Sequence, residues 1–444
     1  MCRILLLIVL LTAHLNLHAQ EVEDKKSRFP LFELSKGDDN TKNLNWGNFH
    51  FSNESYKKAA ERLSKVENPS VETQRKTATA YMEIDSVDLA MSILEQIIEA
   101  DKEVEAEDYL NLSQLQDMRG MYNEANKNRK KYSRQKAREV RVSLFETDDD
   151  YYQKLLNTLS KYDLKNLETN TELSDFGGYA VRSGDDGEDI SMIFASSGIQ
   201  NTGKLSRSKY IRPERPTFNL FTSDFVEDSI HSSNASLIGG SEMNTAFQDG
   251  PAVVSEDGKT IYFTRSGTKS GRDAALHLNI YSANISGNSL SRVRNLPFNN
   301  DEYSVMHPSL SKDGTRLYFS SNMPDGLGGY DLYYVDIDDN GRYSAPVNLG
   351  PGINTEGNEV FPFIFREDVL FFASNAHPGL GGLDIYMTVD LGTENQQVLN
   401  MGTPFNTSSD DFCLYIDTKF KFGYISSNRK GGKGEDDIYS FKID

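Results

Sequence analysis

Cysteine is almost absent from this chain of 444 residues, which contains two. Cys2 precedes the apolar run at the start of the chain, whereas the acylated cysteine of a lipoprotein follows such a run. Cys413 lies within the strand-like stretch FCLYI and reads as a small buried apolar residue. A framework of disulfides within the chain is therefore excluded, and hydrophobic cores must supply the stability.

Positive charge and long apolar runs are also scarce. The sequence has 47 Lys and Arg residues and 66 Asp and Glu residues, which gives a formal net charge of −19. This balance argues against nucleic acids and anionic membranes as partners. After the first residues, no run approaches the roughly 18 apolar residues of a membrane-spanning helix, so we expect no membrane span.

The first residues, MCRILLLIVLLTAHLNLHAQ, have the order of a signal peptide. Arg3 precedes an apolar run from Ile4 to Leu11, and Ala19 offers a small residue for cleavage before Gln20. We therefore expect residues 1–19 to be a signal peptide and the protein to be exported. Residues 20–46 form an N-terminal segment to which we assign no element.

Residues 47–145 are rich in Ala, Leu, Glu and Lys and poor in Gly and Pro, which predicts helices. An aromatic or apolar residue followed three positions later by alanine recurs about every 34 residues, the period of helical hairpins. The pairs are Tyr56 and Ala59, Val87 and Ala90, and Tyr122 and Ala125. This segment resembles about three tetratricopeptide repeats, and an unrelated helical bundle is the alternative.

The stretch KNRKKYSRQKAREVR, over residues 127–141, is basic within an otherwise acidic chain. It holds a single acid, Glu139. One interpretation is a solvated helix face; the other is a docking surface for an acidic partner, with Lys130, Lys131 and Arg134 as candidate residues. Residues 146–160 follow, and we interpret them as a linker.

Residues 161–444 contain a repeat with a period of about fifty residues. One copy reads YFSSNMPDGLGGYDLYYVD from Tyr318, and related stretches begin at Phe371 and Tyr424. Four short strand-like stretches separated by turn residues make up each copy, which is typical of a β-propeller blade. Because the glycine cluster recurs, we interpret it as a hairpin that uses the positive φ of glycine, and not as a phosphate-binding loop.

The connectors between the copies indicate the number of blades. Five connectors carry Asn-Thr or Asn-Asn, which predicts five blades, with six as the alternative. The sequence ends after the third strand of the last copy, and the run KYDLKNL at residues 161–167 can supply the missing outer strand and close the ring. The predicted fold class is α + β multidomain, with an N-terminal α-solenoid and an all-β propeller over residues 161–444.

The repeat resembles the WD40-like (PD40) propeller repeat that TolB also contains, with its Pro, Ser and Asp-Gly at Pro308, Ser311, Asp313 and Gly314. The order of signal peptide, tetratricopeptide-like helices and propeller resembles the Bacteroidetes envelope proteins of the OmpA family. It is similar to the N-terminal part of the type IX secretion component SprE/PorE. Because the sequence ends at Asp444, we do not expect the OmpA-like peptidoglycan-binding domain of that family.

The resemblance implies a location and a function. The location is the periplasm, with association to the outer membrane. The function is that of a non-enzymatic adaptor that binds envelope proteins, among them a PorP/SprF-like outer-membrane barrel, in type IX secretion, gliding or outer-membrane assembly. A glycan- or peptidoglycan-binding propeller is the alternative.

We expect the hairpins and the connectors to share one rim of the propeller and to bind the partner there. The acidic candidates, all in connectors, are Asp301, Glu302, Glu356, Glu359, Asp410 and Asp411. The basic candidates, in the last hairpin, are Arg429, Lys430 and Lys433.

Few patterns indicate catalysis or a cofactor. The sequence has neither a G-x-S-x-G nucleophile motif nor an H-E-x-x-H zinc motif, so we expect no enzyme and no cofactor. Asp336, Asp338 and Asn340 alternate before Gly341 like the start of a calcium loop, but Val347 stands where the loop needs a glutamate. A hairpin turn at Asn340-Gly341 is the alternative interpretation.

Overall fold

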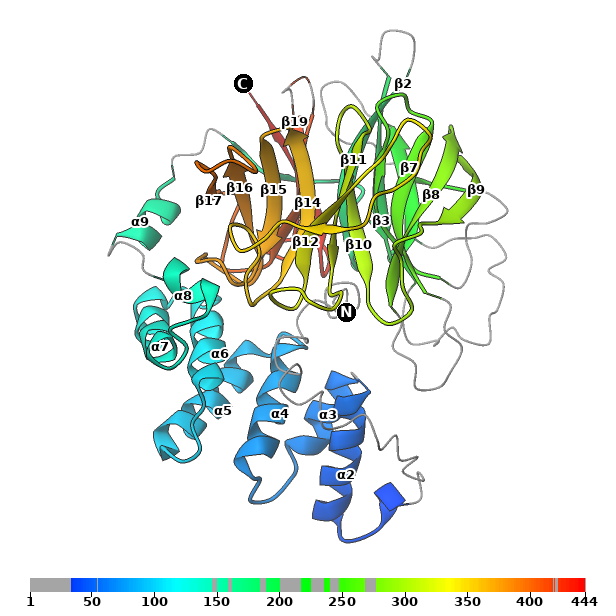
Figure 1. Cartoon of the computed structure of the whole chain (residues 1–444). Coiled ribbons are helices and arrows are strands. Elements are labelled where there is room, and N and C mark those ends of the chain that lie inside the picture. The colour runs from blue at the N-terminus through cyan, green and yellow to red at the C-terminus, as the bar shows by residue number, and fades with distance from the viewer. Residues whose placement is uncertain are drawn as a thin grey trace. The chain divides into compact units, whose positions relative to one another are not determined.

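The computed structural model describes residues 33–53, 55–145, 150–158, 162–183, 189–199, 217–224, 235–239, 247–267, 277–417, 419 and 422–443. The chain divides between residues 148 and 149 into a helical unit and a propeller unit. Figure 1 shows the helices in blue and cyan and the strands from green to red. The predicted signal peptide, residues 1–19, lies outside the described residues.

The helical unit is a series of antiparallel helix pairs, α2 with α3, α4 with α5 and α6 with α7. The recurrent alanines Ala59, Ala90 and Ala125 lie in the second helix of each pair and are fully buried, because a small side chain lets paired helices approach closely. The predicted helical region is thus confirmed. The elements are η1 Glu33–Ser35, α2 Asp39–Ser52, α3 Tyr56–Leu63, α4 Val71–Met82, α5 Val87–Ala100, α6 Ala106–Asp117, α7 Tyr122–Gln135 and α8 Val140–Leu144.

Two helices lie in ranges where we expected no element. Helix α2 begins at Asp39, within the segment 20–46, because the Asp38 side chain caps it by accepting a hydrogen bond from Thr41 N. Helix α9, Tyr151–Leu156, lies within the range 146–160 that we interpreted as a linker. It packs on the propeller: Tyr151 donates to Pro378 O (2.8 Å), and Leu155 O accepts from Thr403 N (3.0 Å).

The described residues of the propeller unit form five four-stranded antiparallel sheets, which confirms the prediction of five blades. Blade 1 is β2 Asp175–Ser183, β3 Asp189–Ser196, β4 Asn219–Asp224 and β5 Ala235–Leu237. Blade 2 is β6 Asp249–Val254, β7 Thr260–Ser266, β8 Leu278–Ser286 and β9 Ser289–Asn295. Blade 3 is β10 Val305–Leu310, β11 Arg316–Ser321, β12 Asp331–Asp336 and β13 Val347–Asn348. Blade 4 is β14 Glu359–Arg366, β15 Val369–Ser374, β16 Asp384–Val389 and β17 Gln397–Asn400.

Blade 5 confirms the predicted closure of the ring. It combines β18 Asp411–Ile416, β19 Phe422–Ser427 and β20 Asp437–Lys442 with β1, Lys165–Asn166, from the opposite end of the propeller sequence. Strand β1 pairs antiparallel with β20, with Lys165 opposite Ser440 and Asn166 opposite Tyr439. The side chain of the next residue, Leu167, is buried in the core between blades 5 and 1. The first and last parts of the propeller sequence therefore share one sheet.

Apolar side chains fill the spaces between neighbouring blades. Strand β6 is buried along its whole length, and β7, β11 and β15 are buried at every position after the first. A sheet packed on both faces loses the alternation of apolar and polar residues, which explains the weak alternation in the sequence.

Candidate functional site

The hairpin between the second and third strands of one blade lies against the connector that leads into the next blade. Gly329 N donates to Gly357 O (2.7 Å), Gly382 N to Ser409 O (3.2 Å) and Glu435 N to Leu173 O (3.0 Å). The hairpins and connectors therefore do share one rim. At each of these three junctions the two loops are held together by backbone hydrogen bonds.

The connector asparagines have a structural role at this rim. Asn354 Nδ2 donates to Leu332 O (3.0 Å), and its Oδ1 accepts from Leu332 N (2.8 Å), so one side chain pairs with the third strand of the preceding blade as a strand residue would. The equivalent pairs are Asn170 with Ile438, Asn299 with Ile280, and Asn406 with Ile385. The Asn-based signature of the connectors is thus explained by packing.

The glycine cluster at the rim also has a structural role, which matches our expectation in blade 5 and differs from it in blade 3. In the hairpin of blade 5, Gly431 has a positive φ of 89°, as expected. In the hairpin of blade 3, the positive φ belongs to Asp325, at 69°, and not to Gly326, Gly328 or Gly329. A Cβ on Gly328 would instead overlap carbonyl oxygens of the next connector, as it would on Gly381 in blade 4. Glycine is required here because the hairpin backbone lies directly on the connector.

Three of the acidic rim candidates are buried, and two of them fully, which corrects the expectation that they face a partner. Glu359 is fully buried and accepts from Thr355 N (2.8 Å), Thr355 Oγ1 (2.7 Å) and Ser374 Oγ (2.8 Å). Burial raises the pKa of Glu359 to about 7. Asp411 is also fully buried, accepts from Thr407 and Ser427, and pairs with Arg429 at 2.6 Å. Both carboxylates tie a connector to its own blade.

Three further candidates of the same rim are directed at the protein itself. Asp410 is 5% exposed and accepts from Leu383 N and Asn428 Nδ2, both at 2.9 Å. Arg429 donates to Pro404 O and Phe405 O in addition to Asp411. Lys433 Nζ donates to Leu167 O and Glu168 O, both at 3.0 Å.

The remaining rim candidates are accessible. Asp301, Glu302 and Lys430 are exposed, and Glu356 is half-buried. Asp301 and Glu302 belong to the connector before blade 3, Lys430 to the hairpin of blade 5, and Glu356 to the connector before blade 4. The exposed charge of the rim is therefore much smaller than the sequence suggested.

The calcium candidates form a hairpin turn. Asp338 Oδ1 accepts from Asn340 N (2.8 Å) and Arg342 N (2.9 Å), and Asp336 pairs with Arg316 at 2.7 Å. Both carboxylates are therefore engaged with the protein. Across the described residues, no group of three or more His, Cys, Asp or Glu side chains is placed to hold a metal ion.

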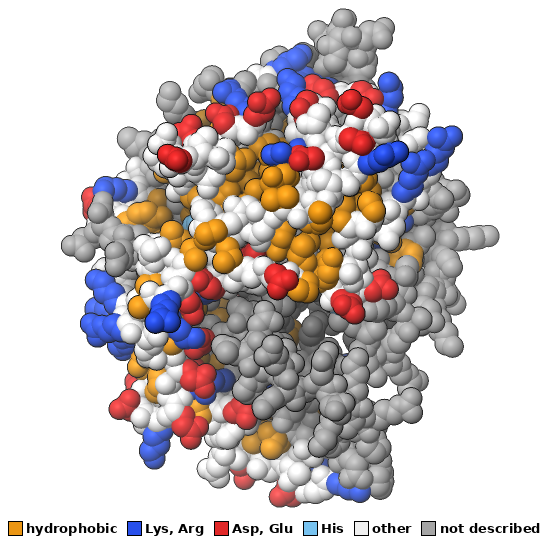
Figure 2. Space-filling view, viewed as in Figure 1, with side chains coloured by type: hydrophobic (Ala, Val, Ile, Leu, Met, Phe, Trp, Pro, Cys, Tyr) orange, Lys and Arg blue, Asp and Glu red, His pale blue; other side chains and the backbone are white. Residues whose placement is uncertain are grey.

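Helix α7 presents the basic candidates on one face. Lys127, Lys130, Lys131 and Arg134 are exposed and follow the spacing i, i+3, i+4 and i+7, which places them along one side of the helix. The opposite side packs inward through Ala125, Asn128, Arg129 and Tyr132. In Figure 2, blue side chains gather over the region that α7 occupies in Figure 1. We call Lys127, Lys130, Lys131 and Arg134 the basic face of α7.

Two other cations of the same stretch are paired with acids of the helical unit. Arg129 pairs with buried Asp117, and Lys136 pairs with Glu107 at 2.6 Å. By contrast, no acid among the described residues forms an ion pair with any member of the basic face. Lys131 Nζ lies over the Tyr109 ring, 4.8 Å from its centroid, a contact that attracts the ammonium weakly and does not neutralise its charge.

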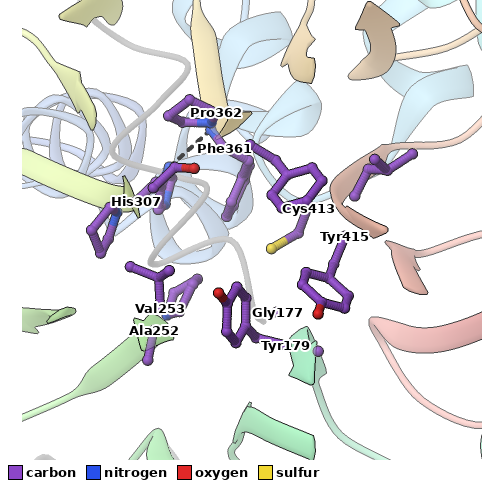
Figure 3. A pocket seen from close by; sticks show the side chains of 15 residues that line it. Gly177, Tyr179, Ala252, Val253, His307, Phe361, Pro362, Cys413 and Tyr415 are labelled. Atoms are coloured by element: carbon purple, nitrogen blue, oxygen red, sulfur yellow. Dashed lines mark hydrogen bonds between the residues drawn. The ribbon is translucent and has the colours of Figure 1, made fainter. Parts of the chain in front are cut away.

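The inner strands of the five blades surround a central channel (Figure 3). Three consecutive residues of each inner strand line this channel. His307, Phe361 and Cys413 are the first of the three in their strands, and their backbone is irregular there, with positive φ of 58°, 52° and 53°. The His307 ring stacks on Phe361 at 3.7 Å, and its Nδ1 accepts from Phe361 N. Burial lowers the pKa of His307 to about 3 and raises that of the Cys413 thiol to about 12.

Neither group in this channel is prepared for catalysis, because a neutral imidazole already bound through Nδ1 and a protonated thiol are both unactivated at neutral pH. The cavity measures about 40 Å³. That volume holds one or a few water molecules, whereas small-molecule sites typically span about 300–1,000 Å³. The channel is therefore nearly filled by side chains, and it is too small to bind a small-molecule ligand.

Comparison with known proteins gives only distant matches, all among solved structures. No protein-family model matches the sequence, and no curated protein matches it. A solved structure described as TolB from Agrobacterium tumefaciens is 14% identical, with 60% of this chain and 76% of that chain covered and a TM-score of 0.34. An α-L-arabinofuranosidase from Lactobacillus brevis is 11% identical, with 66% and 93% covered and a TM-score of 0.37. At these values the matches carry no argument about what this chain binds.

The expectation that the chain is not an enzyme needs correction. The similar solved structures also include a puromycin-hydrolyzing peptidase of Mycobacterium tuberculosis, 15% identical, with a TM-score of 0.33. The match covers 60% of this chain and 37% of the peptidase, so the chain spans well under half of that protein. Enzymes are thus among the similar solved structures, so the expectation that the chain is not an enzyme does not stand, and these matches assign no activity to it.

Of the described helices, none is long and apolar enough to cross a bilayer.

Proposed function

We propose that the protein is a periplasmic adaptor that binds an acidic segment of an envelope protein on the basic face of α7. The finer context that we propose is association with the outer membrane and an accessory role in type IX secretion, gliding or outer-membrane assembly. The PorP/SprF-like barrel is the partner that this context favours. The order of signal peptide, helical repeats and PD40 propeller supports this context.

The observation that carries the proposal is the uncompensated charge of the basic face. Like charges at i and i+4, as at Lys127 with Lys131 and Lys130 with Arg134, destabilise an isolated helix by about 0.2–0.5 kcal/mol per pair. A cation in the last turn of a helix is stabilised by the helix dipole, but only Arg134 lies there. The chain as a whole carries a net charge of −19, so a basic stripe is not a consequence of composition. An acidic partner would offset the repulsion.

The rim of the propeller supports the proposal less. Glu359, Asp410 and Asp411 are used within the propeller. The exposed rim charges among the described residues include the acids Glu168, Glu172, Asp301, Glu302 and Asp325 and the lysines Lys430 and Lys433. Scattered charges of mixed sign offer less electrostatic complementarity to an acidic segment than four cations on one helix face. We therefore place the partner on the helical unit.

Charge reversal tests the proposal. The variant Lys130→Glu, Lys131→Glu and Arg134→Glu should keep the fold and capture the PorP/SprF-like barrel from detergent-solubilised envelopes at least about threefold more weakly. The estimate rests on about 0.2–1 kcal/mol for each exposed ion pair and about 1.4 kcal/mol for a tenfold change in affinity. Capture by the wild-type protein should weaken with salt.

The matched control reverses three exposed lysines of the same unit, Lys57, Lys58 and Lys65. This variant has the same net charge as the α7 variant and should capture the barrel as the wild type does. If both variants bind normally, and binding is lost on reversing Asp301 and Glu302, the partner lies on the rim and the proposal is wrong. Sedimentation of the protein with purified sacculi would support the peptidoglycan alternative instead.

A further inference from the structure

Four of the five inner strands begin with a buried carboxylate at the same position. These residues, at the start of β2, β6, β14 and β18, are at most 1% exposed; they are Asp175, Asp249, Glu359 and Asp411. Blade 3 has Val305 at this position. A carboxylate that recurs at one buried position must be neutralised at each blade, because an isolated buried charge is costly.

In blades 2 and 5 the neutralising group is an arginine. Arg265 contacts both oxygens of Asp249, at 2.6 Å and 3.0 Å, and Arg429 contacts Asp411 at 2.6 Å. Burial raises the pKa of Asp249 and of Asp411, and the guanidinium opposes that increase in each case. An arginine keeps its proton at all ordinary pH values, so these two blades hold a lasting ion pair.

In blades 1 and 4 the cation is missing. Glu359 accepts hydrogen bonds from Thr355 and Ser374, and Asp175 accepts from Thr171 N (2.5 Å) and Thr171 Oγ1 (2.8 Å). Asp175 Oδ1 is buried without a hydrogen-bond partner. No Lys or Arg among the described residues forms an ion pair with Asp175 or Glu359.

The charged groups around both sites make ionisation harder. In each case the third strand of the preceding blade begins with an acid whose negative charge raises the pKa of the buried carboxyl. Asp331 of β12 raises the pKa of Glu359, and Asp437 of β20 raises that of Asp175. Around Glu359, Glu356 of the connector acts on Asp331, and His377 after β15 is neutral and bonded to Ile353 O. Around Asp175, the neighbours on the hairpin side are Glu435, Asp436 and Lys433, whose Nζ is bound to Leu167 O and Glu168 O.

We propose that a proton takes the place of the arginine in blades 1 and 4, and that losing it loosens the connectors 171–175 and 355–359 as the surroundings change from mildly acidic to neutral. Burial raises the pKa of Asp175 from 3.8 to about 6 and that of Glu359 from 4.5 to about 7. A folded state with the higher pKa binds the proton more tightly than the opened state does. The stabilisation is therefore complete below about pH 4, and it is lost as the pH rises through 6 for Asp175 and 7 for Glu359.

Hydrogen exchange on the unmodified full chain tests the proposal, because three equivalent amides report on three blades. Thr171 N, Thr355 N and Thr407 N each donate to the carboxylate of their own blade. Between pH 5 and pH 7, after correction for intrinsic exchange, protection should fall roughly 30-fold at Thr355 and roughly tenfold at Thr171. Protection at Thr407, where Arg429 stays charged, should change less than about threefold.

A substitution separates protonation from general loosening. Glu359→Gln removes the titration, so protection at Thr355 should no longer depend on pH, while Thr171 should still respond. If this variant does not fold, the comparison of the three amides in the wild type decides alone. Parallel changes at all three threonines, or constant protection at Thr171 and Thr355, would overturn the proposal.

Discussion

At the scale of single residues, asparagine side chains at the rim make the hydrogen bonds that the backbone of a neighbouring strand would otherwise make. Each of the four described connector asparagines pairs with the third strand of the preceding blade through both polar atoms of its amide, as Asn406 does with Ile385 (2.7 Å and 2.8 Å). The next residue in three of these connectors is a threonine that caps the buried acid of the following blade; these residues are Thr171, Thr355 and Thr407. One dipeptide therefore connects two blades.

Replacing Gly381 by alanine should destabilise the propeller by about 3 kcal/mol, because the new Cβ overlaps the carbonyl oxygen of Ser409 and forces the hairpin away from the connector. Gly392 provides the control, because it has φ of 77° and open space around its Cβ position. Gly392→Ala should cost about 1 kcal/mol, the strain of a left-handed conformation. Denaturant unfolding of both variants measures the difference, and equal losses would contradict the close-approach explanation.

Sequence reasoning identified the connector signature but misplaced the acids beside it. Glu359 and Asp411 are the first residues of β14 and β18, but polar connector residues precede both in the sequence, so they read as exposed loop residues. Their burial depends on the hairpin of the preceding blade, which lies far away in sequence and covers the connector. The repeat of an acid at the start of four of the five inner strands was the available signal, since a partner-binding surface has no reason to repeat in register.

At the scale of elements, the closing strand was predictable and helix α9 was not. The missing fourth strand of blade 5 left one unpaired edge, and KYDLKNL was the strand-like run without a partner, so closure followed from counting strands. Helix α9 has six residues and is held on the propeller by Tyr151, Leu155 and Thr403, through contacts that cross more than 200 residues of sequence separation. No local pattern reports such contacts.

Replacing Leu167 by aspartate should destabilise the propeller by about 4 kcal/mol, because it places an unpaired charge in the core beside β1 and weakens the closure of the ring. Leu156→Asp is the control at a leucine that is 41% exposed on α9 and should cost under about 0.5 kcal/mol. Thermal unfolding of the two variants gives the comparison. A stable Leu167→Asp variant would show that β1 does not hold the ring closed.

At the scale of the whole molecule, the two hydrophobic periods of the sequence correspond to two compact units. The period of about 34 residues located the helix pairs, and the period of about fifty residues located the blades. The basic face of α7 was visible in the sequence as a local excess of Lys and Arg. Which cations remain uncompensated was not, because Arg129 and Lys136 find their acids on α6, at Asp117 and Glu107.

The most direct test of the adaptor proposal is cross-linking in the cell, with a photo-reactive amino acid placed at Lys130, at Glu302 of the rim or at Lys57 of α3. All three positions are exposed, so they differ in location and not in accessibility. The account predicts a covalent adduct with the PorP/SprF-like barrel from position 130, and none from position 57. An adduct from position 302 with none from position 130 would contradict the account.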